Sequence, residues 1–201
     1  ILRPKINILI IGGTGFIGYH LAKRCLKKKW LVTSISTKPP KKLRRLSGVN
    51  YVYCDISKKN YLKKKINFSY TYVVNLGGHV DHSNNKKIKE THFIGCKNLV
   101  SIFLKKQPKA FIQMGSSVEY GDISSPQKEN AKCKPKTSYG NAKLSSSTYL
   151  INLYKKKNFP SVVLRLYLAY GPKQDFNRFL PIIIDGCLKD KKFPCSSGNQ
   201  F

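Results

Sequence analysis

The sequence predicts an α/β fold, a doubly wound parallel sheet with helices on both faces. Short apolar, β-branched segments recur along the chain, and most are continuous rather than alternating, as in strands buried on both faces. Segments with helical spacing separate them, so strand and helix alternate. With 201 residues and 41% hydrophobic content, the chain suffices for the core of one such domain.

The expected elements follow one another regularly as far as residue 166. Strands are predicted at residues 6–11, 31–35, 49–53, 71–76, 110–114 and 161–166. Helices are predicted at residues 16–29, 58–66, 86–106 and 139–156. Residues 115–138 are rich in Gly, Ser, Pro and Lys and have no period. A long loop beside strand ends is a usual place for a functional site.

The composition indicates which binding partners and which cellular compartment to expect. The formal net charge is +29, but the lysines are scattered through every segment, which favours solvated helix faces over a nucleic-acid surface. The six cysteines form no Cys-x-x-Cys pair, as expected in a reducing cytoplasm. No apolar run approaches the ~18 residues of a spanning helix. We therefore expect a cytoplasmic protein that binds neither nucleic acid nor membrane.

A glycine-rich turn follows the first predicted strand and opens the first helix. Gly13, Gly15 and Gly18 make a G-x-G-x-x-G pattern, and Gly12, Gly15 and Gly18 make the G-x-x-G-x-x-G variant. Glycines let a pyrophosphate approach the backbone, and the helix N-terminus supplies N–H groups and positive potential. The turn predicts a Rossmann-type site for NAD or NADP. Its expected cofactor contacts are Gly12, Gly13, Thr14, Gly15, Phe16, Ile17 and Gly18.

The end of the second strand bears on the choice of cofactor. An NAD site usually places an acidic residue here, against the ribose hydroxyls. This chain has Ser36, Thr37 and Lys38, with further cations just beyond. No carboxylate repels a 2′-phosphate, so we favour NADP(H) over NAD. The alternative is that these lysines belong only to the general lysine excess.

The third and fourth strands end in further candidate cofactor contacts. Asp55 and Ile56 close the third strand, and Leu76, Gly77 and Gly78 close the fourth. Both ends are expected at the same crevice as the glycine turn, because ligands of open α/β sheets bind outside the carboxyl ends of the strands. Asp55 is expected to accept from the adenine amino group. Its alternative role is a helix N-cap.

A Tyr-x-x-x-Lys pair opens the helix after the long loop. Tyr139 and Lys143 share one helix face, so the ammonium favours the ionised phenol that a base near neutral pH requires. Only this pair follows the fifth strand and its Ser116. The same spacing also occurs in two other pairs, Tyr19 with Lys23 and Tyr61 with Lys65.

The order of these motifs resembles that of the extended short-chain dehydrogenases, in particular the NAD-dependent epimerase/dehydratase group. Besides the turn and the pair, it includes Gly115-Ser116-Ser117, Tyr120-Gly121, and Leu164-Arg165 through Tyr170-Gly171-Pro172. The resemblance covers nearly the whole chain. It implies that Tyr139 exchanges a proton with a sugar hydroxyl, Lys143 binds the nicotinamide ribose, and Ser116 hydrogen-bonds the reacting oxygen.

The resemblance implies a sugar-nucleotide epimerase or 4-keto reductase, and the sequence does not choose between them. Dehydratases of the family carry an Asp-Glu pair where this chain has Ser117-Val118, so a dehydratase is disfavoured. Glu119 is one position later and is expected to point elsewhere. Asparagines that the family's epimerases often show at the positions of Leu168 and near Thr91 are missing. The rival interpretation is a non-catalytic NAD(P)-binding or sensor protein of the same fold.

Residues 1–166 are predicted to form the NAD(P)-binding domain, and residues 167–201 the beginning of an incomplete substrate-binding lobe, so we expect a fragment of a longer protein. Ser117 and Arg178 are the expected substrate contacts, Arg178 on a diphosphate, although it also fits a surface arginine. His79-x-x-His82 lacks a third metal ligand at suitable spacing, so we predict a loop and no metal site. The resemblance allows a homodimer, but the sequence does not fix the oligomeric state.

Overall fold

The computed structural model describes residues 5–66, 68–78, 84–195 and 197. The chain divides into two compact units, residues 1–167 and residues 168–201. The first unit contains the whole sheet and every predicted catalytic residue. The proposed role of residues 167–201 as the start of a substrate lobe stays a prediction.

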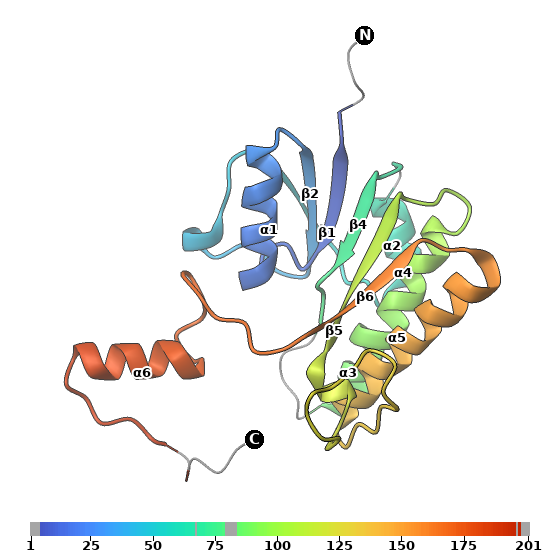
Figure 1. Ribbon diagram of the computed structural model, residues 1–201. Helices are drawn as coiled ribbons and strands as arrows, with labels where there is room; N and C mark the ends of the chain where they lie inside the picture. The colour runs from blue at the N-terminus through green and yellow to red at the C-terminus, as the bar shows by residue number, and fades with distance from the viewer. Residues whose placement is uncertain (1–4, 67, 79–83, 196, 198–201) are drawn as a thin grey trace. The chain divides into compact units, whose positions relative to one another are not determined.

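Six parallel strands form one sheet in the order β3-β2-β1-β4-β5-β6 (Figure 1). They are β1 (Asn7–Ile11), β2 (Leu31–Ser36), β3 (Val49–Tyr53), β4 (Tyr72–Asn75), β5 (Ala110–Ser116) and β6 (Ser161–Leu166). The predicted doubly wound sheet is confirmed. The strand order reverses between β1 and β4, and this switch point is where open α/β sheets bind ligands.

The helices of the first unit lie where helical spacing was expected. They are α1 (Phe16–Lys27), α2 (Lys59–Lys65), α3 (Asn85–Lys89), α4 (Gly95–Phe103) and α5 (Ser138–Lys157). The predicted helix 86–106 has an additional feature, because a π-helical turn, η2 (Glu90–Ile94), joins α3 to α4. Two short 3₁₀ turns, η1 (Lys42–Arg44) and η3 (Ser117–Glu119), follow strands β2 and β5.

Helices cover both faces of the sheet. In Figure 1, α1 lies in front of β1 and β2, while α2, α4 and α5 lie behind the sheet. The larger core cluster fills the α2–α4–α5 side and includes Leu99, Phe103, Phe111, Leu150 and Phe159, each at most 2% exposed. A smaller cluster lies between α1 and strands β1 and β2. Burial on both faces explains why the strand sequences are continuously apolar.

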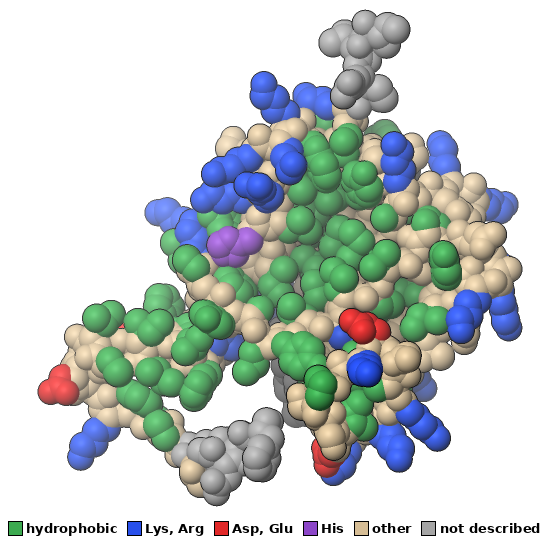
Figure 2. All heavy atoms as spheres, in the orientation of Figure 1, with side chains coloured by type: hydrophobic (Ala, Val, Ile, Leu, Met, Phe, Trp, Pro, Cys, Tyr) green, Lys and Arg blue, Asp and Glu red, His purple; other side chains and the backbone are tan. Residues whose placement is uncertain are grey.

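The side chains of strand β6 differ in kind between the two faces of the sheet. Val162 and Leu164 are each 47% exposed, on the face of the sheet that carries α1. Figure 2 shows hydrophobic side chains gathered over this part of the sheet. Side chains alternate along a strand, so Val163 and Arg165 point to the opposite face, towards α5. A charged residue in such a strand requires a partner.

The second unit contains helix α6 (Phe179–Leu188). Its apolar side chains are largely exposed within this structure, with Phe179 at 72% and Leu188 at 81%. Arg178 is the N-cap residue of α6. Among the described residues, no helix is long and apolar enough to cross a membrane.

Helix α1 packs closely against the turn that precedes it, and this packing predicts the effect of Gly18→Ala. A Cβ at position 18 would lie 2.3 Å from the Gly12 carbonyl oxygen, so α1 must move away from β1. We expect a loss of about 1–3 kcal/mol in the free energy of unfolding, measured by urea denaturation of the full-length protein. The control is Lys23→Ala on the exposed face of α1, expected within about 0.5 kcal/mol of wild type. Equal stability of the two variants would contradict the close packing of Gly18 against the Gly12 carbonyl.

Candidate active site

The glycine turn lies at the carboxyl end of β1, beside the end of β4. Gly12 has φ +77°, a conformation that favours glycine, and its N–H donates to the Ile35 carbonyl over 2.7 Å. A Cβ at position 12 would lie 3.1 Å from the Leu76 carbonyl oxygen. Gly15 is the N-cap of α1, and among the described residues no side chain caps this helix. The turn therefore presents close backbone and a positive helix end, which fit a pyrophosphate.

The other predicted cofactor contacts surround this turn. The Thr14 N–H donates to Ser36 Oγ over 3.4 Å, which ties the turn to the end of β2. Asp55 Oδ1 accepts from the Ser57 N–H over 2.9 Å. The N-cap of α2 is Lys58, so Asp55 caps a turn after β3 rather than the helix itself. These side chains and Ile56 lie at the ends of neighbouring strands, and their contact with a dinucleotide stays a prediction.

A buried pair of amide side chains joins the end of β4 to the middle of β5. Asn75 Nδ2 donates to Gln113 Oε1 over 2.8 Å, and both residues are 1% exposed. Asn75 Oδ1 also accepts from the Gly77 N–H over 3.1 Å. A Cβ at Gly77 would lie 2.8 Å from Ile11 Cγ2, so this backbone lies against β1. The pair fixes the predicted Leu76-Gly77-Gly78 segment at the crevice, and sequence reasoning did not identify it.

Ser116, Tyr139 and Lys143 meet at the end of β5. Ser116 ends the strand, while Tyr139 is in the first turn of α5, where Thr137 Oγ1 caps the helix by accepting from the Gly140 N–H. The Ser116 side chain lies beside the Tyr139 phenol, within reach of a hydrogen bond that affects its pKa. Lys143 Nζ lies 5.7 Å from the centroid of the Tyr139 ring and donates to the Met114 carbonyl over 2.9 Å. The two segments that carry these residues thus form one site.

Burial dominates the electrostatics of this site. It raises the pKa of Tyr139, which the hydrogen bond from Ser116 lowers and the carboxylate of Glu119 raises further. Burial also lowers the pKa of Lys143 to about 8, although Glu119 opposes this shift. The ammonium therefore remains charged near neutral pH. Its positive charge beside the phenol favours phenolate formation, which burial alone disfavours.

His92 is a further neighbour of Tyr139 that sequence reasoning did not identify. It lies in the π-helical turn η2 and is 4% exposed. Its ring meets the Tyr139 ring edge-on, with centroids 5.1 Å apart. The His92 carbonyl accepts from Ser146 Oγ over 3.0 Å, which ties α5 to η2. No sequence signal indicated this contact, because π-turns at functional sites have no simple sequence pattern.

The remaining predicted residues take no part in the contacts between Ser116, Tyr139 and Lys143. Ser117 is half-buried in η3 beside Ser116, and Thr37 and Lys38 follow β2, with Lys38 exposed. Arg178 belongs to the second unit, so its contact with a diphosphate stays a prediction. The predicted loop with His79 and His82 lies outside the described residues. Within the described part of the chain, no group of three His, Cys, Asp or Glu could hold a metal ion.

The fold and the motifs agree with comparisons to known proteins. The profile of the NAD dependent epimerase/dehydratase family matches residues 8–200. The chain belongs to this family. Among curated family relatives, it is 28% identical to a dTDP-D-glucose 4,6-dehydratase of Dictyostelium discoideum, over 92% of this chain and 49% of the relative. It is also 28% identical to a UDP-N-acetyl-alpha-D-glucosaminuronate decarboxylase of Bacillus cytotoxicus, over 84% of this chain and 56% of the relative.

Solved structures of the family share the fold. A UDP-glucose 4-epimerase of Thermotoga maritima, crystallised with UDP-glucose, has a TM-score of 0.86 at 23% identity over 93% of this chain and 64% of its own. A UDP-glucuronic acid 4-epimerase of Bacillus cereus, in complex with NAD, has a TM-score of 0.81 at 25% identity over 92% and 63%. The chain spans about half the length of the curated relatives that it matches.

Burial of Lys143 predicts how the Lys143→Met variant responds to pH. The folded-state pKa of about 8 is below the usual 10.5, so the charged ammonium opposes folding below pH 8. Between these values the unfolded chain binds more protons, and wild-type stability rises with pH relative to the variant. We expect the free energy of unfolding of the variant, relative to that of wild type, to fall by on the order of 1–2 kcal/mol between about pH 7.5 and 9.5.

The measurement is urea denaturation of both full-length proteins at the two pH values. The control is Lys155→Met on the exposed face of α5, for which the difference from wild type should not change with pH. A Lys143→Met difference that is equally independent of pH would show that Lys143 is not a buried cation.

Proposed function

We propose that this protein is an NAD(P)-dependent enzyme that acts on a sugar nucleotide at a ring carbon, as an epimerase or a 4-keto reductase. The observation that carries this proposal is that the side chains of Ser116 and Tyr139 lie together, with Lys143 beside the phenol. This group lies at the carboxyl ends of the strands, as does the glycine turn. Family membership and the substrates named for the solved relatives support the same reaction class.

In the proposed mechanism, Tyr139 exchanges a proton with the sugar hydroxyl whose carbon is oxidised or reduced. Ser116 donates a hydrogen bond to the same oxygen and holds it near the phenol. Lys143 stabilises the phenolate by its charge. The glycine turn, Asp55 and the Leu76-Gly77-Gly78 segment would hold a dinucleotide, which would supply the acceptor or donor of hydride. The glycine turn fits a dinucleotide, because Gly12 and Gly18 allow the tight backbone packing of the turn, and no described side chain caps the N-terminus of α1.

Water elimination is a poorer fit to this site. Ser117 and Val118 occupy the positions after Ser116 where the family's dehydratases carry Asp and Glu. The next carboxylate, Glu119, is fully buried and accepts hydrogen bonds from the Ser116 N–H and from Arg165. A carboxylate engaged in this way has no free oxygen facing a substrate. This favours epimerisation or reduction over dehydration.

The decisive variant for the proposed function is Tyr139→Phe. Removal of the proton-transferring hydroxyl should lower kcat about 10²–10⁴-fold, while the Kd for NAD(P) stays within about threefold. The matched control is Tyr61→Phe, because Tyr61 has a lysine at the same spacing but is 49% exposed on α2. Turnover is followed with a panel of UDP and dTDP sugars and the full-length protein. Undiminished turnover by Tyr139→Phe would exclude the mechanism, and tight NAD(P) binding without any turnover would favour a non-catalytic sensor.

We also propose that the site prefers NADP to NAD, although the solved relatives include complexes with NAD. Ser36 ends β2, where a carboxylate would repel a 2′-phosphate, and Lys38 follows it. Ser36→Asp should therefore raise the Kd for NADP at least about tenfold and leave that for NAD unchanged or lower. Isothermal titration of both cofactors measures this, with Ser69→Asp, exposed before β4, as the control. A wild-type preference for NAD would refute the proposal.

A further inference from the structure

Glu119 is a fully buried carboxylate at the end of β5, and its exposed fraction is 0%. It is the last residue of η3, the 3₁₀ turn that follows Ser116 directly. A carboxylate removed from water is strongly destabilising unless hydrogen bonds and an opposite charge compensate for the lost hydration. The contacts of its two oxygens therefore indicate what Glu119 does.

One carboxylate oxygen holds the backbone of Ser116. Glu119 Oε1 accepts from the Ser116 N–H over 2.9 Å, and Ser116 Oγ accepts from the Val118 N–H over 3.3 Å. Together these bonds form a capping box at the start of η3. A Cβ at Gly115 would lie 2.5 Å from Oε1, so the glycine leaves the space that the carboxylate occupies. The end of β5 is thus built around this side chain.

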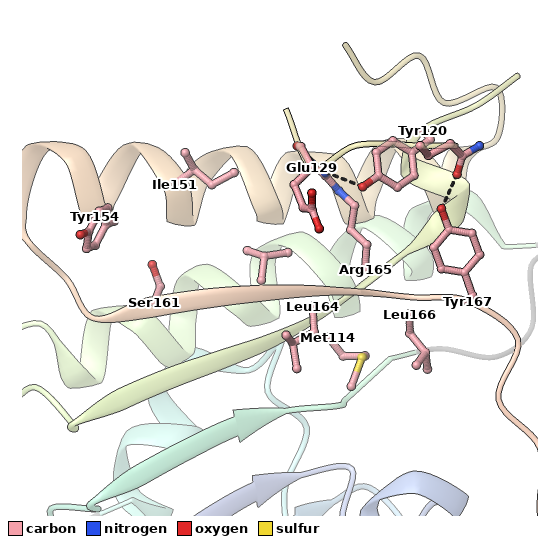
Figure 3. Close-up of a pocket in the computed structure, with 12 residues that line it drawn as sticks. Met114, Tyr120, Glu129, Ile151, Tyr154, Ser161, Leu164, Arg165, Leu166 and Tyr167 are labelled. Carbon is pink, nitrogen blue, oxygen red and sulfur yellow. Dashed lines mark hydrogen bonds between the residues drawn. The ribbon is translucent and has the colours of Figure 1, made fainter. Parts of the chain in front are cut away.

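The other oxygen is held by Arg165, the charged residue on the α5 side of β6. Arg165 Nε donates to Glu119 Oε2 over 3.0 Å, and the two side chains are 13% and 0% exposed. The guanidinium is itself fixed, since Nη1 donates to Tyr120 Oη over 3.3 Å and to the Glu129 carbonyl over 3.0 Å. Figure 3 shows Arg165 pointing from β6 towards Tyr120 and Glu129, beneath α5. The carboxylate is therefore held from two sides.

We propose that Glu119 is a positioning residue: anchored by Arg165, its carboxylate holds the Ser116 backbone so that the Ser116 hydroxyl stays within hydrogen-bonding reach of Tyr139. Its catalytic consequence rests on the function proposed above. Glu119 does not touch the substrate in this assignment and acts only through Ser116. A shift of about 1 Å in a catalytic group can cost about 10²-fold in rate, so the anchor matters although it lies behind the site.

Three variants of the full-length protein test this assignment. Glu119→Val removes both acceptor oxygens, and Glu119→Gln keeps one oxygen for the Ser116 N–H. The double variant Glu119→Val with Arg165→Met avoids leaving a buried, unpaired guanidinium that could prevent folding. The control is Asp122→Asn, an exposed carboxylate 69% accessible in the following loop, paired with Lys136.

The first readout is independent of turnover: hydrogen exchange of the Ser116 amide, followed by NMR. Exchange should be about tenfold faster or more in Glu119→Val and in the double variant, because a hydrogen bond to a charged acceptor is lost. Glu119→Gln should stay within about threefold of wild type, and Asp122→Asn should be unchanged. Unchanged exchange in the folded double variant would overturn the assignment.

The second readout is steady-state kinetics. Glu119→Val and the double variant should lower kcat about 10²-fold with KM within about threefold, whereas Glu119→Gln should recover most of kcat. In a Ser116→Ala background, Glu119→Val should add little further loss, because both changes remove the same interaction. Wild-type kcat in the double variant would overturn the assignment. If the wild-type protein turns over no sugar nucleotide, the proposed function is wrong, and amide exchange still decides whether Glu119 holds Ser116.

Discussion

The parallel ladders of the sheet are the constraint on which the rest of the structure depends. Because all six strands run in one direction, their carboxyl ends lie at one edge, and the loops that follow them meet there. Residues as distant in sequence as Gly12, Leu76 and Ser116 reach the same edge of the sheet only through this pairing. The buried Asn75–Gln113 hydrogen bond then ties the end of β4 to β5. Side chains at this edge are therefore positioned by the backbone of the sheet rather than by flexible loops.

At this edge, two effects of burial oppose each other. Removal from water favours the neutral phenol of Tyr139 and the neutral amine of Lys143, whereas the proximity of the two groups favours the ion pair. Lys143 retains its charge near neutral pH because its pKa falls only to about 8. Glu119 adds a negative charge, and Arg165 neutralises it. Such balanced, perturbed groups in one crevice are typical of catalytic sites.

The fold followed from the sequence because continuous apolar strands, helical spacing and a glycine turn are all local patterns. Tyr139 and Lys143 could be selected over pairs of equal spacing because they follow the fifth strand directly. The Glu119–Arg165 pair was not found, since its partners are 46 residues apart and their contact depends on how β6 packs. A lone arginine in an apolar strand was the available signal. Nor did the pattern that selected Lys143 predict that this lysine, unlike the many surface lysines, is buried.

The π-helical turn between α3 and α4 has a geometric consequence for the whole segment. Ile88 and Cys96 flank it and are both buried, at 1% and 0% exposure. In an uninterrupted α-helix, residues eight apart differ in direction by about 80° around the axis. The wider turn absorbs one residue, so eight residues advance roughly as seven would, and both side chains point inward. The extra residue thus keeps the buried faces of α3 and α4 on the same side of the segment. His92 lies within the π-helical turn itself, and its ring faces Tyr139.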